Sequence, residues 1–211
     1  MPMPISNAVF TDGSAKVIPY ERLRDQIRDG DLMLCSGSAV FSRLIQVATE
    51  SIWSHVGFVM WLPSLGRLMV LESVESAGVR SVPLSSYLGD YNGTGRGYPG
   101  NVLIARHDDF ANRALTDEFI EFAVDRFGWP YHADQIVNIA ARIASRGILG
   151  KVHPDTDKER AFICSEYVDA CYRRLGVTVH WDQFGFVAPA DFANDRKVHA
   201  IGILDTTGAP K

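Results

Sequence analysis

Three short segments rich in β-branched and aromatic residues follow one another with brief connections, and this order constrains the fold most. They cover His55 to Trp61, Arg67 to Ser73, and Gly78 to Val82. Such segments, bounded by turn residues, are typical of strands. Because parallel neighbours need long crossovers, the brief connections predict antiparallel pairing. The chain is therefore expected to contain a mostly antiparallel sheet.

Helices and further strands are expected on both sides of these segments. The other expected strands are Asp31 to Cys35, Asn101 to Arg106 and Val198 to Leu204. The expected helices are Tyr20 to Arg28, one capped by Ser38 and running to Ala48, Asp109 to Phe127, one near Asp134 to Ser145, Cys164 to Leu175, and a helical turn from Pro189 to Phe192. A surface loop is expected from Gly89 to Gly100 and a polar inserted loop from Arg146 to Arg160. Gly176 is expected in the C′ position after the Cys164 helix. Helices flanking an antiparallel sheet indicate an α+β fold.

The size and charge of the chain exclude several classes of protein. With 211 residues and a mass of 23.3 kDa, a single domain over residues 1–211 is expected. The 21 basic and 25 acidic residues give a net charge of -4, which argues against a nucleic-acid binder with a basic face. The longest apolar stretch, Val56 to Leu62, is far shorter than the ~20 residues of a membrane span. The first residues lack the features of a secretory signal, so we expect a cytoplasmic protein, with export by a route without a cleavable signal left open.

Three cysteines, Cys35, Cys164 and Cys171, are too few to indicate a disulfide scaffold, and they cannot all pair. Cys164 opens an expected helix, where unpaired amides and the helix dipole stabilise a thiolate. This position favours a nucleophile. The alternative is that Cys164 is a small buried hydrophobic residue, an interpretation that suits Cys35 and Cys171 better.

A nucleophilic cysteine needs a base, and of six histidines His55 is the strongest candidate. It begins an expected strand, which would hold its ring rigidly, and Gly57 leaves room beside it. A hydrogen-bonded structural role is the alternative. Glu72 lies in an apolar strand, where a buried carboxylate needs a partner, so it is the candidate to orient the imidazole. An exposed position for Glu72 is the alternative, and Glu75 is a weaker candidate for the orienting role.

Motifs for other chemistries are missing from the sequence. It has no phosphate-binding Gly-x-x-x-x-Gly-Lys loop, no Gly-x-Ser-x-Gly elbow, and neither His-Glu-x-x-His nor paired Cys-x-x-Cys. The run from Gly95 to Gly100 matches Gly-x-Gly-x-x-Gly, but it follows a loop and precedes a strand, so we interpret it as a chance match. A zinc site would need scattered ligands. We therefore expect no metal and no cofactor.

Five short motifs occur in an order that resembles a known family. They are Gly30-Asp31-Leu32, Trp53-Ser54-His55-Val56-Gly57, Gly128-Trp129-Pro130-Tyr131, Ile163-Cys164-Ser165-Glu166-Tyr167 and Pro189-Ala190-Asp191-Phe192. Together they resemble the YiiX/YaeF-like proteins, the circularly permuted branch of the NlpC/P60 papain-like cysteine hydrolases. The resemblance spans about residues 29–192, and the order of His55 before Cys164 agrees with the permutation.

The resemblance implies a small antiparallel sheet or half-barrel packed against helices, one of which carries the cysteine at its N-terminus. It implies Cys164 as nucleophile, His55 as general base and Glu72 as the orienting residue. It also implies Ser165, Glu166 and Tyr131 as substrate-binding residues.

The activity that the resemblance implies is cysteine-dependent hydrolysis of amide bonds in cell-wall peptides or N-acyl amides. The sequence departs from the family pattern in two ways. His132 stands where the family often has an acidic residue, and many relatives are exported, whereas no secretory signal is recognised here. The alternatives are a lipid-directed acyltransferase or thioesterase of the lecithin:retinol acyltransferase type, or a binding module without turnover. The residues around Cys164 differ from the Asn-Cys-Glu-His motif of the former.

Overall fold

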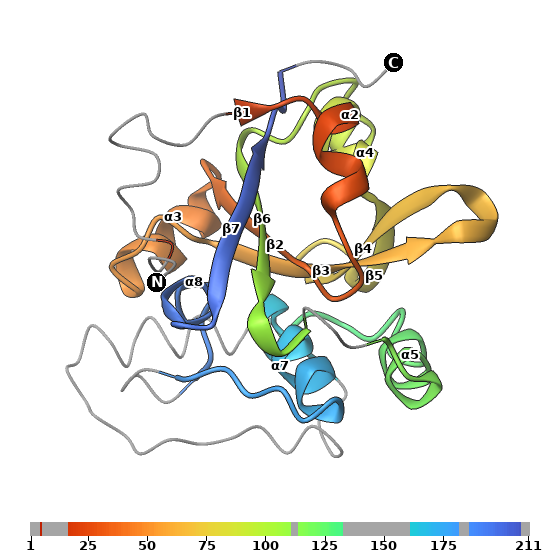
Figure 1. The fold of residues 1–211 in the computed structure, drawn as a ribbon. Helices are drawn as coiled ribbons and strands as arrows, with labels where there is room; N and C mark the ends of the chain where they lie inside the picture. The colour runs from red at the N-terminus through yellow and green to blue at the C-terminus, as the bar shows by residue number, and fades with distance from the viewer. Residues whose placement is uncertain (1–4, 6–16, 111–113, 133–160, 182–185, 208–211) are drawn as a thin grey trace.

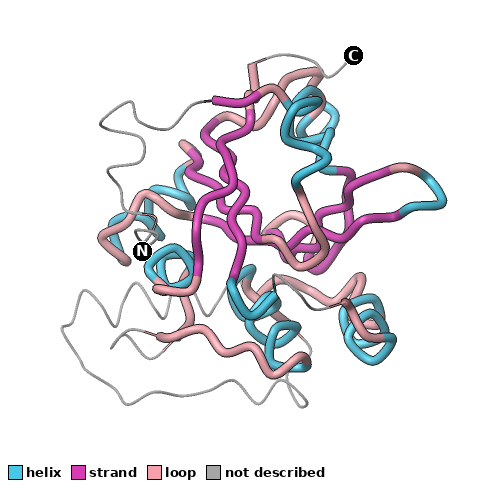
Figure 2. Tube along the Cα trace, viewed as in Figure 1, coloured by secondary structure: helices cyan, strands magenta, loops and turns pink. Residues whose placement is uncertain are grey.

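A single seven-stranded sheet organises the molecule (Figures 1 and 2). The structure is a computed structural model that describes residues 5, 17–110, 114–132, 161–181 and 186–207. The strands are β1 (Val17–Ile18), β2 (Leu32–Gly37), β3 (His55–Leu62), β4 (Arg67–Val74), β5 (Gly78–Pro83), β6 (Gly100–His107) and β7 (Val198–Leu204). Their spatial order is β1-β7-β6-β2-β3-β4-β5.

Pairing in the sheet is antiparallel except between β1 and β7, which run parallel. The three consecutive strands predicted from the sequence, β3, β4 and β5, pair with their neighbours along the chain. The predicted mostly antiparallel sheet is therefore confirmed. The short strand β1, which the sequence did not reveal, extends the edge beyond β7.

Apolar side chains alternate between the two faces of the sheet and build two separate cores. On one face, Leu34, Val56, Phe58 and Leu71 join a large cluster with residues of α7 (Cys164–Arg174) and α5 (Asp117–Val124). On the other face, Met33, Cys35, Val59 and Val70 pack with residues of α2 (Tyr20–Leu23) and α4 (Leu84–Gly89). The period of two that places successive side chains on opposite faces produces this division.

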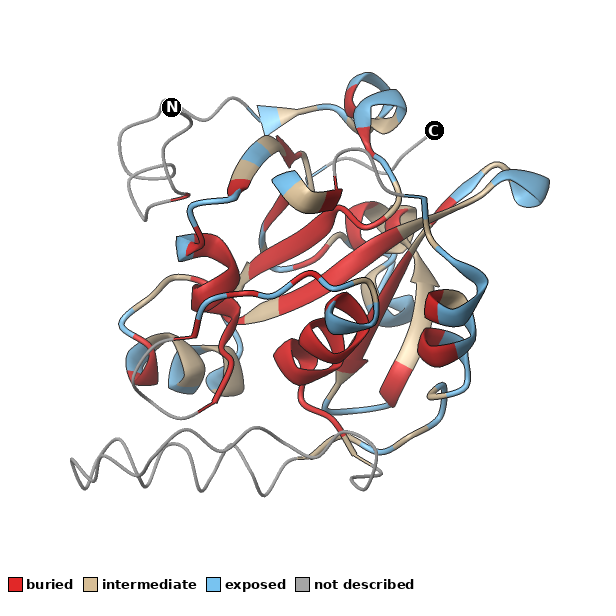
Figure 3. Cartoon of the chain, turned by 60° about the horizontal axis from the view of Figure 1, so that its bottom comes forward, coloured by how far each residue is buried: buried red, intermediate tan, exposed pale blue. Residues whose placement is uncertain are grey.

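The other helices among the described residues are α3 (Val40–Ala48) and α8 (Pro189–Asn194), with 3₁₀ turns at Arg24–Gln26, Pro63–Leu65, Tyr91–Gly93 and Asp108–Phe110. Helix α7 packs against β3 and β4 and is buried along most of its length (Figure 3). This mixed arrangement is the α+β fold predicted above. Within the described residues, no helix has both the length and the apolar character needed to cross a bilayer.

Several predicted helix boundaries were wrong. The helix expected from Asp109 to Phe127 is only Asp117–Val124, because the Thr116 hydroxyl accepts the Phe119 N–H at 3.2 Å and begins the helix there. Ser38 does not cap α3; its hydroxyl donates instead to the Pro99 carbonyl at 3.1 Å.

The helix expected from Tyr20 to Arg28 consists of α2 and a 3₁₀ turn that ends at Gln26. Helix α4 was not expected at all, and it includes Gly89; the rest of the expected Gly89 to Gly100 loop is irregular up to β6, which begins at Gly100, apart from one 3₁₀ turn. The helix expected near Asp134 to Ser145 and the loop from Arg146 to Arg160 lie outside the described residues.

Candidate active site

Cys164 is the first residue of α7, as predicted. The Ile163 N–H donates to the Glu166 carboxylate at 3.2 Å, which satisfies one of the amides left unpaired at the start of a helix. At the other end, Gly176 follows the helix with a φ of +69°, a conformation that glycine adopts without strain. The cysteine therefore stands at the positive end of an eleven-residue helix with defined ends.

Hydrogen bonds fix the start of α7 against the strand that carries Glu72. The Ser73 hydroxyl donates to the Phe162 carbonyl at 2.7 Å, joining residues 89 positions apart. The Phe162 N–H donates to the Pro130 carbonyl at 3.2 Å, and Phe162 forms a bridge with Tyr131. Phe162, two residues before Cys164, is therefore anchored to both the sheet and the 130–132 segment.

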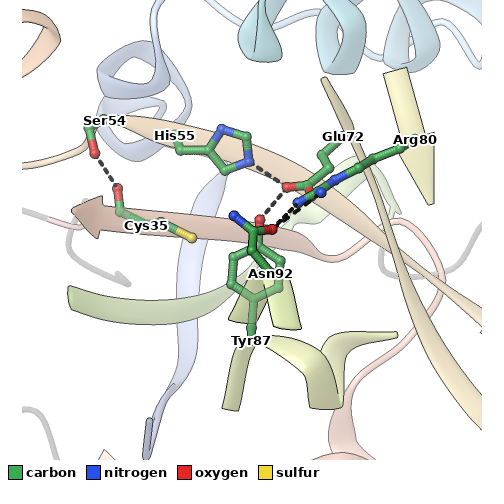
Figure 4. Close-up of polar contacts among 7 residues, drawn as sticks. All are labelled: Cys35, Ser54, His55, Glu72, Arg80, Tyr87 and Asn92. Atoms are coloured by element: carbon green, nitrogen blue, oxygen red, sulfur yellow. Dashed lines mark hydrogen bonds and ion pairs between the residues drawn. The ribbon is translucent and has the colours of Figure 1, made fainter. Parts of the chain in front are cut away.

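His55 begins β3, where its position is set by pairing with β2. Cys35 is its direct partner across the two strands. The Ser54 N–H donates to the Cys35 carbonyl at 2.9 Å, and the Gly37 N–H donates to the Ser54 hydroxyl at 3.0 Å (Figure 4 shows Ser54 beside Cys35). The backbone next to the imidazole is therefore held on both sides.

Glu72, on β4, contacts His55 directly. Its Oε2 lies 2.6 Å from His55 Nε2 and also accepts the Tyr87 hydroxyl, while Arg80 Nε donates to Oε1 at 2.9 Å (Figure 4). The carboxylate is fully buried. Gly57 makes room for it, because a Cβ at this position would lie 3.3 Å from Glu72 Cβ and 3.0 Å from the Leu71 carbonyl oxygen.

The contacts of His55 and Glu72 favour their charged forms. Burial opposes the charge on His55, but hydrogen bonds to Cys164 and Glu72 raise its pKa to about 10. Burial also opposes the charge on Glu72, but the hydrogen bond and charge of His55, with Arg80 and Tyr87, lower its pKa. At neutral pH the imidazole is therefore a cation placed between the Cys164 sulfur and the Glu72 carboxylate.

A cleft of about 380 Å³ opens beside His55. Its walls are aromatic and hydroxyl side chains from α3, β4 and the 91–98 loop, and include Glu75. The lining residues are Ala39, Phe41, Ser42, Ile45, Ser54, His55, Ser73, Val74, Glu75, Ser76, Tyr91, Tyr98 and Tyr131. Cys164 itself is 2% exposed.

The structure brings together Cys164, His55 and Glu72, the three residues expected to carry the chemistry. Tyr131, expected to bind substrate, lines the cleft. Ser165 and Glu166, expected in the same role, are buried, and Glu166 supports the start of α7.

Sequence reasoning missed Arg80, Tyr87 and Ser73. Arg80 had a usable signal, since it lies opposite Glu72 in the β4–β5 hairpin, where opposite charges attract. Tyr87 lies on the unexpected helix α4, and nothing local indicated its contact with Glu72.

Comparisons with known proteins agree with the fold. Residues 26–201 match the family described as permuted papain-like amidase enzyme, YaeF/YiiX, C92 family. Among solved structures, the chain is similar to metalloprotein yiiX from Escherichia coli O157:H7, with 17% identity, a TM-score of 0.56 and coverage of 88% of this chain and 99% of that one. No curated protein matches the chain.

The structural similarity to the Escherichia coli protein concerns the fold, and the family match extends over most of the chain. The order of the elements agrees with the permutation, because the strand that carries His55 comes before the helix that carries Cys164. The chain therefore belongs to the permuted papain-like amidase family of YaeF and YiiX.

Proposed function

We propose that this protein is a cysteine amidase in which Cys164 is the nucleophile, His55 the general base and acid, and Glu72 the residue that orients His55. The observation that carries the proposal is the position of the His55 ring, which lies 2.6 Å from the Glu72 carboxylate and has its pKa raised by both Cys164 and Glu72. A base held by a third group beside a nucleophile is the arrangement that acyl-transfer enzymes share. The amidase family supports an amide or peptide substrate.

The reaction begins with Cys164 deprotonated and His55 carrying the proton. Nε2 faces Glu72 (Figure 4), so we assign the other ring nitrogen, Nδ1, to Cys164. The thiolate attacks the carbonyl carbon, and amides at the start of α7 stabilise the negative charge on the oxygen. His55 then protonates the leaving amine as the C–N bond breaks and a thioester forms. Water gives a proton to His55 and attacks the thioester, which releases the carboxylic acid and restores the Cys164 thiolate beside protonated His55.

The steps above use side chains, backbone amides and water. The similar Escherichia coli protein is described as a metalloprotein. Within the residues described here, no three His, Cys, Asp or Glu side chains gather closely enough to hold a metal ion. The described part of the site does not fit a metal centre, so no step is assigned to one.

Single cysteine variants test the proposal with a panel of cell-wall stem peptides and N-acyl amino acids. The wild-type protein should hydrolyse at least one member of the panel, and Cys164→Ala should abolish that hydrolysis with the fold intact. Cys171→Ala is the matched control, because Cys171 is a buried cysteine on the same helix. Hydrolysis retained by Cys164→Ala would exclude it as the nucleophile.

A second candidate substrate class is an amide with a long acyl chain. Helix α3 exposes apolar side chains at Val40 (88%), Val47 (77%) and Leu44 (40%), on the helix whose Phe41 and Ile45 line the cleft. An acyl chain that leaves the cleft could lie along this face and shield it from water.

Acyl-chain length tests this second candidate. Hydrolysis of dodecanoyl amides should exceed that of acetyl amides, and the double variant Val40→Ser with Val47→Ser should lower only the former. Equal rates for both chain lengths would remove this candidate and leave the short-chain or peptide substrates.

A further inference from the structure

The Glu72 carboxylate is held by three elements at once. His55 approaches Oε2 from β3, Tyr87 donates its hydroxyl to the same oxygen from α4, and Arg80 donates to Oε1 from β5 (Figure 4). The guanidinium of Arg80 also approaches Asn92 Oδ1 at 3.4 Å, so its far side faces the 91–98 loop. The carboxylate therefore has one orientation that satisfies all its partners.

Burial makes these donors necessary for the charge on Glu72. A carboxylate withdrawn from water takes up a proton readily unless donors and cations favour its ionised form. The Arg80 charge and the Tyr87 hydroxyl both act in this sense. The other titratable groups near Glu72 are His55 on β3, Cys35 on β2 and Tyr91 of the loop, and Cys164 on α7 lies beyond His55.

We propose that Arg80 and Tyr87 are positioning residues for the reaction, which keep Glu72 ionised and oriented so that His55 presents Nδ1 to Cys164. This inference rests on the proposed function. Neither residue meets the substrate in this assignment; both act through Glu72. Removing either should therefore change how the reactivity of Cys164 depends on pH, beyond any change in stability.

The experiment measures the alkylation of Cys164 by iodoacetamide from acidic to mildly alkaline pH, with the modified peptide quantified by mass spectrometry. In Arg80→Met, Glu72 should take up a proton nearer neutral pH. The acid limb of the profile, which is the pH range over which the alkylation rate of Cys164 rises, should therefore move to higher pH by about one unit. Tyr87→Phe, which keeps the ring, should move the limb in the same direction by less. Arg80→Lys should restore part of the wild-type profile because it keeps the charge.

Matched controls separate positioning from stability. Arg173→Met removes an arginine bonded to Asp169 at 2.7 Å, and Tyr172→Phe removes a buried hydroxyl that donates to the Gly30 carbonyl at 2.6 Å. Both groups lie outside the site, so their loss should lower stability and leave the pH profile of Cys164 unchanged. Should Arg80→Met fail to fold, Tyr87→Phe and Arg80→Lys decide the question.

A Glu72→Gln background tests whether the two residues act through Glu72. There, Arg80→Met and Tyr87→Phe should produce no further shift of the acid limb. An unmoved limb in the single variants, or equal shifts in both backgrounds, would overturn the inference. If His55→Ala leaves the alkylation rate of Cys164 unchanged, the proposed function itself fails; if His55→Ala lowers the rate and the Arg80 and Tyr87 variants do not, only the positioning roles fail.

Discussion

Two buried carboxylate–arginine pairs in this molecule share the same chemistry but differ in what surrounds them. Asp31 and Arg106 form two hydrogen bonds of 2.7 Å, and Glu72 and Arg80 form one of 2.9 Å. Asp31 is 1% exposed and Glu72 is 0% exposed. Asp31 also accepts the backbone N–H of Arg28 at 2.8 Å, whereas Glu72 also contacts His55 and Tyr87.

The difference lies in the remaining partners. Backbone groups close the Asp31 pair, since Arg106 also donates to the Gln26 carbonyl at 2.7 Å. Glu72 instead accepts a hydrogen bond from the imidazole of His55, which lines the cleft. Under the proposed function, the Asp31 pair stabilises a junction between backbone segments, whereas the Glu72 pair orients a titratable side chain that lines the cleft. Substitutions in the two pairs should separate activity from stability.

The largest expected effect is on activity, from Glu72→Gln. The amide keeps the shape of the carboxylate but cannot balance the positive charge on His55. Amide hydrolysis should fall by about 10²- to 10⁴-fold, the range of general acid–base contributions. The rate is measured on a panel substrate that wild type hydrolyses, with circular dichroism as the control for folding. Full activity in this variant would show that His55 needs no carboxylate.

Next in size is the loss of stability in Asp31→Asn. Removing one charge leaves the Arg106 guanidinium without its counter-charge, which costs about 3 to 5 kcal/mol for a buried pair. Urea unfolding measures the free energy of unfolding, and hydrolysis per folded molecule should stay at the wild-type value. A comparable loss of hydrolysis would contradict the separation of the two pairs.

Local sequence patterns revealed the strands and the helix start of the site more readily than the contacts between distant segments. The β-branched and aromatic residues of β3 and β4 and the position of Cys164 at a helix start are local features, so both were predictable. The contact between Tyr87 and Glu72 depends on a six-residue helix without a side-chain cap, and no local signal marks it. Thr116 shows the same limit, because an apolar spacing that continues upstream concealed the true start of α5.

The meeting of His55 with Cys164 is the least local contact of the site. Segments 109 positions apart come together through the packing of α7 on β3 and β4, and through the hydrogen bond from Ser73 to Phe162. From residue types alone, the pairing of His55 with Cys164 was a hypothesis. The resemblance to a permuted family supported it, because in that family the histidine also precedes the cysteine. Ser165 and Glu166 lie next to Cys164 in sequence, but the helix turns both side chains into the protein.

The dependence of stability on pH should distinguish the two pairs as well. The pKa of His55 is about 10 in the folded protein and 6.5 without perturbation. Because it is raised, protonated His55 contributes stability that is full below pH 6.5 and is lost as the pH rises towards about 10. Urea unfolding across this range should show a steeper loss in wild type than in His55→Gln, whereas Asp31→Asn should keep the wild-type slope. Identical slopes in wild type and His55→Gln would contradict the assignment.

The smallest expected effect, in Gly57→Ala, sharpens the comparison without removing any charge. The added Cβ would lie 3.0 Å from the Leu71 oxygen and Val70 Cγ1, and 3.3 Å from Glu72 Cβ. Such crowding costs about 1 to 3 kcal/mol and displaces its neighbours by a few tenths of an ångström. Because a misplacement of about 1 Å can cost about 10²-fold in rate, hydrolysis should fall by about tenfold. Gly57→Ala should therefore lose less stability than Asp31→Asn but far more activity, and a variant with wild-type hydrolysis would show that the position of Glu72 tolerates this displacement.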